Sequence, residues 1–347
     1  MKNIYIYPYS YNLITILKRE IKGFTIKGVI NNNIGIGNIL FSKCKCKSIN
    51  IDELNYRSVM EDVDGILVYN HSFNDIDEEL DIILKKFMLN NKNIYYTCEL
   101  ESYINALNYD RSFKISGFST ENSRTYNKNY KIKQISKPVI LILGLGQNCD
   151  KNNVGMELND FFISKGYKPA LISGNTLGAL LGFYTFPILE SNFEESVKKF
   201  NFMINAIDRE SNPDLFIITA ISGIVKHDNS HNNLYGYPSF VITSAVVPDI
   251  SIMSLYAGKY EMEDIKFLQN ISYYKLNTKF EYIHISNSIC DLNIETNNLD
   301  FFPIDDVTMI KSLISKDFPM YSIEDDESKN LIHDKILEEL RSNVKQI

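Results

Sequence analysis

Short apolar runs alternate with amphipathic segments along the first third of the chain. The runs have the length and the β-branched and aromatic content of strands buried on both faces. The segments between them repeat apolar residues at helical spacing, as at Leu80, Ile83, Leu84 and Phe87. The predicted strands are 3–7, 25–30, 63–69 and 93–97, and the predicted helices are 11–22, 75–90 and 99–107. Alternating strands and helices indicate parallel pairing, so this part predicts a doubly wound, Rossmann-like α/β domain.

The same alternation restarts at residue 138. The run PVILIL at 138–143 is the most strand-like in the chain, and a Gly-rich turn and a helical segment follow it. The predicted strands are 138–143, 168–172, 214–219, 239–243 and 282–285, and the predicted helices are 154–165, 193–210, 304–314 and 328–344. The second half therefore predicts another mainly parallel α/β domain.

The segment 112–137 separates the two patterns. It is rich in Ser, Asn, Lys and Tyr, shows little periodicity of either kind, and ends at Lys137–Pro138. It is typical of an interdomain linker or of a β-ribbon that crosses between domains. The predicted organisation is thus a domain at 1–111, the linker or ribbon at 112–137, and a domain at 138–347.

Composition narrows the class of protein. Of the 347 residues, 44% are hydrophobic and 23% charged, which is the balance of a globular protein and excludes a disordered chain. The net charge of −7 argues against a nucleic-acid-binding protein. No apolar run reaches the roughly 20 residues of a membrane span, and the first residues lack the apolar core of a secretion signal. The sequence predicts a cytoplasmic protein without nucleic-acid or membrane partners.

Cysteine and histidine spacing gives no metal site. The five cysteines are an odd number in a chain without an export signal, which indicates reduced thiols. Cys44 and Cys46 are two residues apart, not three as in a zinc knuckle, and no second pair completes four ligands. His227 and His231 have suitable spacing but lie in the polar loop KHDNSHNN, which does not fix them on one face. No metal site is predicted.

The most informative segment is VILILGLGQNCDKNNVGMELNDFFISKGYKPALISGN, which begins at Val139. It reads as a strand, a Gly-rich turn, a helix and another strand. The first N–H groups of a helix are unpaired and carry a partial positive charge, so such a turn at the end of a central strand is where α/β folds bind anions.

The turn only partly fits the P-loop motif G-x-x-x-x-G-K-[ST]. Counted from Gly144, Cys149 stands at the second glycine and Asp150 at the lysine. Counted from Gly146, Lys151 stands at the second glycine. The basic residue is thus displaced, and Asp150 would repel a phosphate.

The residues beyond the turn also depart from the motif. Asn152 or Asn153 replaces the hydroxyl that holds Mg²⁺ in active enzymes. The strand at 214–219 ends in TAISG, without an acidic residue to hold a metal. The loop is therefore interpreted as a degenerate P-loop, and NTP hydrolysis by the usual route is not expected.

The dinucleotide fingerprint G-x-G-x-x-G fits incompletely as well. Gly144 and Gly146 match, but Cys149 stands at the third glycine. The following strand ends in ISGN at 172–175, without the acidic residue that binds a ribose hydroxyl.

Several interpretations of the loop stay open at this stage. The glycines serve either tight strand-to-helix packing or a pocket for a nucleotide, phosphate or other anion. Cys149 is either a small packing residue or a nucleophile whose pKa is lowered by the helix and Lys151. The candidate binding residues are Gly144, Gly146, Asn148, Asp150, Lys151 and Asn152. Asn175 and Asp249 are secondary pocket candidates, although Asp249 would also suit the cap of a following helix or turn.

The chain contains the segments ILGLGQNCDK, GYKPALISGN, LLGFYTFP, DLFIIT with SGI, VVPDISIMS, and an opening IYPYSYNLITILK followed by GVI. Together these resemble the clostridial peptide-maturation-system proteins, which are encoded beside a radical SAM enzyme that modifies a small Cys-rich, bacteriocin-like peptide. The resemblance covers most of the chain and implies a role in ribosomal peptide natural-product maturation. It implies no catalytic residue, because the family has no established reaction.

Two functions are therefore expected as alternatives. The first is an accessory protein that binds the precursor peptide, the radical SAM maturase or both, without efficient NTP hydrolysis. The second is a nucleotide-dependent ligase, kinase or transferase that uses the loop from Gly144 to Lys151.

Overall fold

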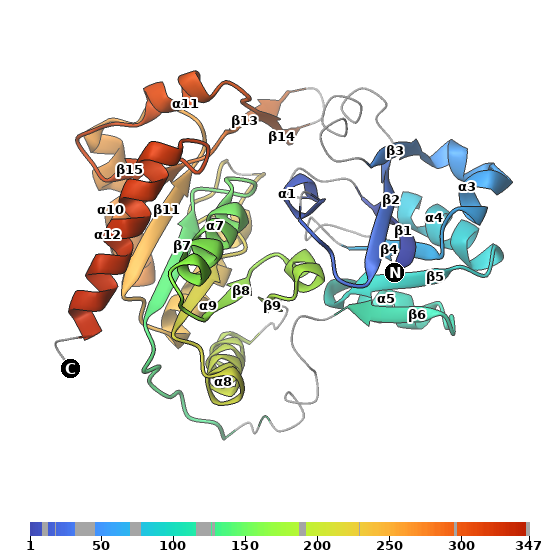
Figure 1. Ribbon diagram of the computed structural model, residues 1–347, viewed down its shortest axis with the longest axis horizontal. Coiled ribbons are helices and arrows are strands. Elements are labelled where there is room, and N and C mark those ends of the chain that lie inside the picture. Colours follow the sequence, from blue (N-terminus) through green and yellow to red (C-terminus); the bar gives the residue numbers. More distant parts are fainter. Residues whose placement is uncertain are drawn as a thin grey trace. The chain divides into compact units, whose positions relative to one another are not determined.

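The computed structural model describes residues 1–8, 13–17, 19–31, 46–69, 78–115, 126, 129–186, 192–228, 230–294 and 297–344 (Figure 1). The chain divides into two compact units. The first comprises Met1–Ser119 and Asn175–Pro187, and the second comprises Thr120–Gly174 and Ile188–Ile347. The chain forms two mainly parallel sheets with flanking helices, as the sequence predicts.

The first sheet has six parallel strands in the order β3-β2-β1-β4-β5-β6. This is the strand order of the Rossmann fold. Its strands are β1 (Lys2–Tyr7), β2 (Phe24–Asn31), β3 (Lys47–Asn50), β4 (Gly65–Val68), β5 (Asn93–Thr97) and β6 (Ser112–Ile115). The helices are α1 (Leu13–Leu17), η1 (Ile51–Asn55), α3 (Arg57–Glu61), α4 (Glu78–Leu89), η2 (Cys98–Leu100), α5 (Glu101–Ala106) and η3 (Thr176–Leu181).

Alternate residues of these strands enter two separate cores. On β1, Tyr5 and Tyr7 pack with α4 and α5 on one face, whereas Ile4 and Ile6 pack with α1 and η3 on the other. Successive side chains of a strand point to opposite faces, so a strand that is apolar throughout requires helices on both sides. This requirement explains the continuous apolar runs in the sequence.

Strand β6 corrects the predicted boundary at residue 112. It pairs with β5 from Ser112 to Ile115, although the sequence placed these residues in the linker or ribbon. β6 is a half-exposed edge strand, so it has no apolar run. Residues 116–125, 127 and 128 of the predicted linker lie outside the described residues, as do parts of the predicted helices 11–22 and 75–90.

The second sheet has seven strands in the order β15-β12-β11-β7-β10-β8-β9. Its strands are β7 (Val139–Gly144), β8 (Pro169–Ser173), β9 (Tyr184–Thr185), β10 (Leu215–Thr219), β11 (Ile250–Leu255), β12 (Tyr282–Ile285) and β15 (Met320–Tyr321). A separate antiparallel hairpin consists of β13 (Ser288–Asn293) and β14 (Asn298–Pro303). The helices are α7 (Lys151–Ser164), α8 (Phe193–Ser211), η4 (Asn233–Gly236), α9 (Tyr237–Ala245), α10 (Met262–Leu276), α11 (Val307–Leu313) and α12 (Asp326–Val344).

Strand β7 lies between β10 and β11 in the second sheet. The chain passes from β7 to β8, returns to β10, and then crosses to β11 on the opposite side of β7. The direction of strand succession therefore reverses at β7. In open α/β sheets, ligands bind at the carboxyl ends of strands at such a reversal, and the loop after β7 has this position.

One prediction beside β11 is wrong, and strand β11 itself was not predicted. Residues 239–243 were predicted as a strand but lie in helix α9, which has Pro238 in its first turn and packs on α8 and α10. Strand β11 was not predicted, because Ser251 and Ser254 interrupt its apolar residues. Both serines are buried, since β11 is covered on both faces.

None of the helices in the described ranges has the length and apolar character that a membrane span requires.

Candidate functional site

The loop 145–150 joins the carboxyl end of β7 to the first turn of α7. Lys151 is the first helical residue, and Asp150 before it has a φ of 61°. This left-handed conformation is the one that glycine adopts most readily. A P-loop count anchored on Lys151 therefore puts the motif lysine at Lys151, the second glycine at Asp150 and the hydroxyl residue at Asn152, but it moves the first glycine to Leu145. With this count the lysine is no longer displaced, and the departures from the motif are Leu145, Asp150 and Asn152.

The Lys151 side chain turns back into its own loop. It is only 5% exposed, and Nζ donates a hydrogen bond of 2.5 Å to the carbonyl oxygen of Gly146. Nζ also lies 3.5 Å from the Sγ atom of Cys149. A Cβ atom on Gly144 would lie 2.6 Å from Lys151 Cδ and 2.8 Å from its Nζ, so glycine leaves room for this path. The ammonium group therefore binds the loop itself.

Asp150 is a buried carboxyl group beside this lysine. It is 2% exposed and accepts hydrogen bonds from Asn153 Nδ2 at 2.8 Å and from the Asn287 backbone N–H at 3.3 Å. Burial is the main cause that raises the pKa of Asp150 from 3.8 to about 7, and the nearby Glu324 carboxylate contributes to this rise. The site thus disfavours additional negative charge at neutral pH.

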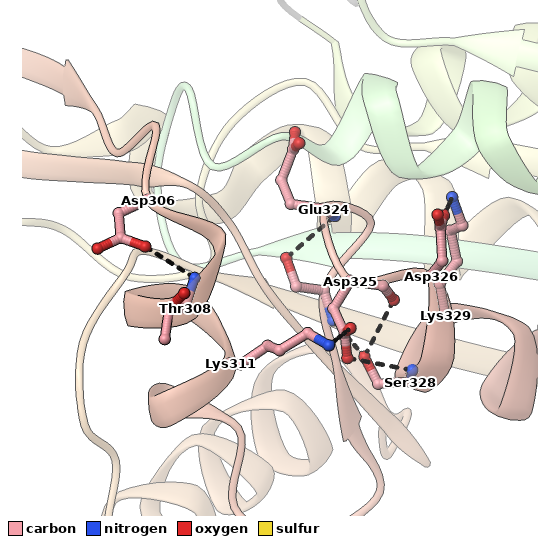
Figure 2. A network of polar contacts seen from close by, with 9 residues as sticks. Asp306, Thr308, Lys311, Glu324, Asp325, Asp326, Ser328 and Lys329 are labelled. Carbon is pink, nitrogen blue, oxygen red and sulfur yellow. Dashed lines mark hydrogen bonds and ion pairs between the residues drawn. The ribbon is translucent and has the colours of Figure 1, made fainter.

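Glu324 precedes a polar network that holds the start of α12 (Figure 2). Asp325 accepts a hydrogen bond from the Ser328 backbone N–H at 3.2 Å, as a helix cap does. Lys311 of α11 forms an ion pair of 2.8 Å with the same carboxylate. On α11 itself, Asp306 accepts from the Thr308 backbone N–H at 2.8 Å. The network thus fixes the segment that brings Glu324 toward Asp150.

Asn152 ties the start of α7 to two neighbouring strands. Its Oδ1 atom accepts hydrogen bonds from Thr219 Oγ1 at 2.7 Å and Ser173 Oγ at 3.3 Å. Thr219 Oγ1 accepts from the Gly174 backbone N–H at 2.8 Å. The amide at the position of the Mg²⁺-binding hydroxyl therefore has a structural role.

The rest of the loop is held from both sides. Tyr256, just after β11, donates a hydrogen bond of 2.5 Å to the Gln147 carbonyl oxygen, and its hydroxyl leaves no space for a Cβ atom on Gly146. On the other side, a Cβ atom on Gly223 would meet the backbone of the loop at Gly146. Asn148, within the same loop, has a φ of 53°.

The buried thiol of Cys149 donates to the Gly146 carbonyl oxygen at 3.2 Å. This arrangement is that of a packing residue.

Of the two secondary candidates, the structure places Asp249 away from the loop residues. Asp249 precedes β11 and accepts a hydrogen bond of 2.8 Å from the Val139 backbone N–H at the start of β7. It therefore lies at the amino edge of the sheet, opposite the loop. The sequence-based placement of Asp249 near the loop is wrong because the strand that follows it was not recognised. Asn175 belongs to the first unit and caps η3, where its side chain accepts from the Leu177 N–H at 3.0 Å.

Three residues at the carboxyl edge were missed by sequence reasoning: Ser254, Tyr256 and His284. The Ser254 hydroxyl donates to the Cys149 carbonyl oxygen and lies 2.7 Å from His284 Nδ1. The available signal was a serine inside the apolar run ISIMSL, which indicates a buried polar contact once that run is recognised as a strand.

Within the described ranges, no group of three or more His, Cys, Asp or Glu residues is placed to hold a metal ion. His227 and His231 have ring centres 6.4 Å apart. The Nδ1 atom of His231 lies 2.9 Å from an oxygen of Asp228. Cys44, the other metal candidate, lies outside the described residues.

The fold and the loop define a two-unit α/β protein whose second unit is P-loop-like with a degenerate loop. The sequence matches no family model and no curated protein. Among solved structures, a DUF1611 family protein from Anabaena variabilis ATCC 29413 is similar with a TM-score of 0.55 and 11% identity, over 82% of this chain and 88% of that chain. At this identity the likeness concerns the fold alone.

Two further matches are weaker. A nucleotide-binding protein in complex with ADP from Archaeoglobus fulgidus has a TM-score of 0.28 and 12% identity, over 56% of this chain and 85% of its own. Chloroplast FtsY from Physcomitrella patens has a TM-score of 0.28 and 11% identity, over 70% and 91%.

Proposed function

We propose that the protein is an accessory protein of ribosomal peptide natural-product maturation, which binds the precursor peptide, the radical SAM maturase or both. In this proposal it does not hydrolyse NTP efficiently. The peptide role rests on the resemblance of the segments around ILGLGQNCDK to the clostridial peptide-maturation-system proteins.

The observation that supports the non-hydrolytic part is the inward-turned Lys151. In active P-loop proteins the lysine reaches the β- and γ-phosphates. Here its ammonium donates to Gly146, and a phosphate would have to displace this bond beside the buried Asp150. The amide of Asn152 stands where a hydroxyl would hold Mg²⁺ and is itself engaged by Thr219. Binding and hydrolysis of Mg²⁺–NTP are both disfavoured by this arrangement.

The peptide role is tested with tagged full-length protein in a native host. We expect the tagged protein to retain the precursor peptide or the maturase, and deletion of its gene to reduce peptide modification measured by mass spectrometry. Modification that is unchanged by deletion, together with no retained partner, would refute the accessory role.

The rival function is a nucleotide-dependent enzyme, and the specific observation in its favour is the position of Lys151 at the N-terminus of α7. A ligand at 100 times its dissociation constant adds about 2.7 kcal/mol to stability. We expect no such thermal shift with ATP, GTP, NAD or coenzyme A. A shift that Lys151→Met abolishes and the exposed-site control Lys335→Met preserves would show ligand binding at the loop and favour the rival.

A further inference from the structure

One cross-strand row of the second sheet is polar within otherwise apolar strands. Ser254 on β11 is in register with His284 on β12, and His284 is in register with Tyr321 on β15. All three side chains are fully buried. His333 of α12 adds a second imidazole, which is 2% exposed. The Tyr321 ring centre lies 5.4 Å from that of His284 and 5.8 Å from that of His333.

The hydrogen bonds of Ser254 fix the protonation of His284. A serine hydroxyl has one proton, and Ser254 donates it to the Cys149 carbonyl oxygen, which can only accept. The contact of 2.7 Å between Ser254 Oγ and His284 Nδ1 must therefore be donated by Nδ1–H. A neutral imidazole with a proton on Nδ1 has a bare lone pair on Nε2.

Both imidazoles are neutral at physiological pH. Burial is the main cause that lowers the pKa of His284 to about 3, and the nearby His333 contributes to this decrease. Burial likewise lowers the pKa of His333 to about 4, and Lys329 acts in the same direction.

Three buried polar atoms in this cluster have no hydrogen-bond partner among the described residues. They are His284 Nε2, Tyr321 Oη and His333 Nε2. A buried acceptor or donor without a partner is destabilising, and proteins commonly satisfy such groups with an internal water molecule that makes two to four hydrogen bonds. The phenol is a donor and each neutral imidazole supplies an acceptor, so these three groups use both protons and one of the two lone pairs of a single water.

We propose that a buried water molecule bridges His284 Nε2, Tyr321 Oη and His333 Nε2. It accepts a hydrogen bond from the Tyr321 hydroxyl and donates one hydrogen bond to each imidazole. The water completes a hydrogen-bond chain from the loop carbonyl of Cys149 to helix α12. His284 is then a positioning residue for the loop, and this assignment holds whether or not the loop binds a ligand.

The substitution Tyr321→Phe tests the bridge because it removes only the hydroxyl. If that hydroxyl donates to the water, its loss should raise the equilibrium constant of unfolding of the second unit about tenfold. If the hydroxyl has no partner, the substitution removes an unsatisfied buried group, and the constant should fall or stay unchanged, which would overturn the proposal.

The matched control is Tyr95→Phe in the first unit. The Tyr95 hydroxyl is also buried and has no hydrogen-bond partner in the part of the chain that the structure describes, but its ring neighbours are Phe24 and Phe113. We expect this substitution not to destabilise the first unit. Amide hydrogen exchange of β12 and of β5 reports the two units separately.

The second measurement needs no variant. Long-range nitrogen–proton NMR of the wild-type protein distinguishes the two neutral tautomers of each histidine. We expect the Nδ1–H tautomer for both His284 and His333. An Nε2–H tautomer at His284 would overturn the chain, because Nε2 could then no longer accept from water.

Discussion

Asp150 gives the sharpest test of the site, through the substitution Asp150→Asn. The amide has the same size, and asparagine is among the residues that best tolerate a left-handed backbone such as the φ of 61° at this position. Its oxygen can still accept from the Asn287 N–H, and its nitrogen can donate to Asn153 once that amide flips. The variant therefore removes the ionisable group while keeping the local hydrogen bonds.

The magnitude follows from the pKa of Asp150, which burial raises from 3.8 to about 7. The folded state binds this proton more tightly than the unfolded state does. The stabilising contribution of Asp150 is therefore fully present below pH 3.8 and is lost as pH rises through about 7. One pKa unit corresponds to about 1.4 kcal/mol, so ionisation of the buried group costs about 4 kcal/mol at pH 8.

Urea denaturation of wild type and Asp150→Asn between pH 5 and 9 measures this difference. We expect the variant to gain stability relative to wild type by about 1.4 kcal/mol per pH unit up to about pH 7, with a level difference above that. Glu338→Gln makes the same acid-to-amide change at an exposed position of the same unit and is the matched control. A flat difference for Asp150→Asn would refute the buried, proton-binding carboxyl group.

Three further predictions test packing, capping and the buried histidines. Gly144→Ala should destabilise the second unit by about 1–3 kcal/mol because its Cβ would meet Cys149 and Lys151. The control Gly258→Ala should be tolerated, because the nearest contact of its Cβ would be 3.6 Å. Equal urea midpoints for the two variants would contradict this prediction. Asp325→Ala should destabilise α12 by about 1 kcal/mol because the helix loses its cap. The measurement is the rate of amide hydrogen exchange in α12, which should increase. Asp326→Ala, at the next and exposed position, is the control. Because the pKa values of His284 and His333 are lowered, their stabilising contribution is complete above the ordinary value of 6.5 and is lost as pH falls toward 4. Protonation of Asp150 opposes this loss in the wild type, so the free energy of unfolding should fall more steeply with decreasing pH in Asp150→Asn. An unchanged slope would count against buried, neutral imidazoles at these two positions.

The sequence predicted the sheets because their signal is local. Apolar runs such as 139–144 need no partner to be recognised, and their alternation with helices indicates parallel pairing. Strand β6 and strand β11 were missed because an edge strand and a serine-containing strand lack a continuous apolar run. The position of the candidate loop was likewise predictable from strand, glycine and helix order.

The direction of the loop side chains was not predictable from the sequence. Lys151 and Asp150 are adjacent charged residues in a turn, for which solvent exposure is the ordinary expectation. Their burial depends on contacts with Gly146 and with Asn287, which is 137 positions away from Asp150. The polar row through Ser254 and His284 depends equally on strand register, which a single sequence does not specify.

Burial of Asp150 also makes a prediction about anions. An anion that binds at the start of α7 would displace Lys151 from Gly146 and would place negative charge beside Asp150. Repulsion is absent when Asp150 is protonated, so anion affinity should fall as pH rises through the pKa of about 7. Sulfate does not titrate in this range and is the appropriate probe.

In a sulfate titration followed by thermal shift, we expect any wild-type affinity to weaken between pH 6 and pH 9, and the affinity of Asp150→Asn to stay constant. The Lys151→Met variant should lose the pH-dependent part of the sulfate affinity. Because the comparison is between two pH values in one protein, it separates the loop from other basic sites, whose affinity would not depend on Asp150. Sulfate affinity with the same pH dependence in wild type and Asp150→Asn would show that anions bind elsewhere, and the loop would then be a structural element that only resembles an anion site.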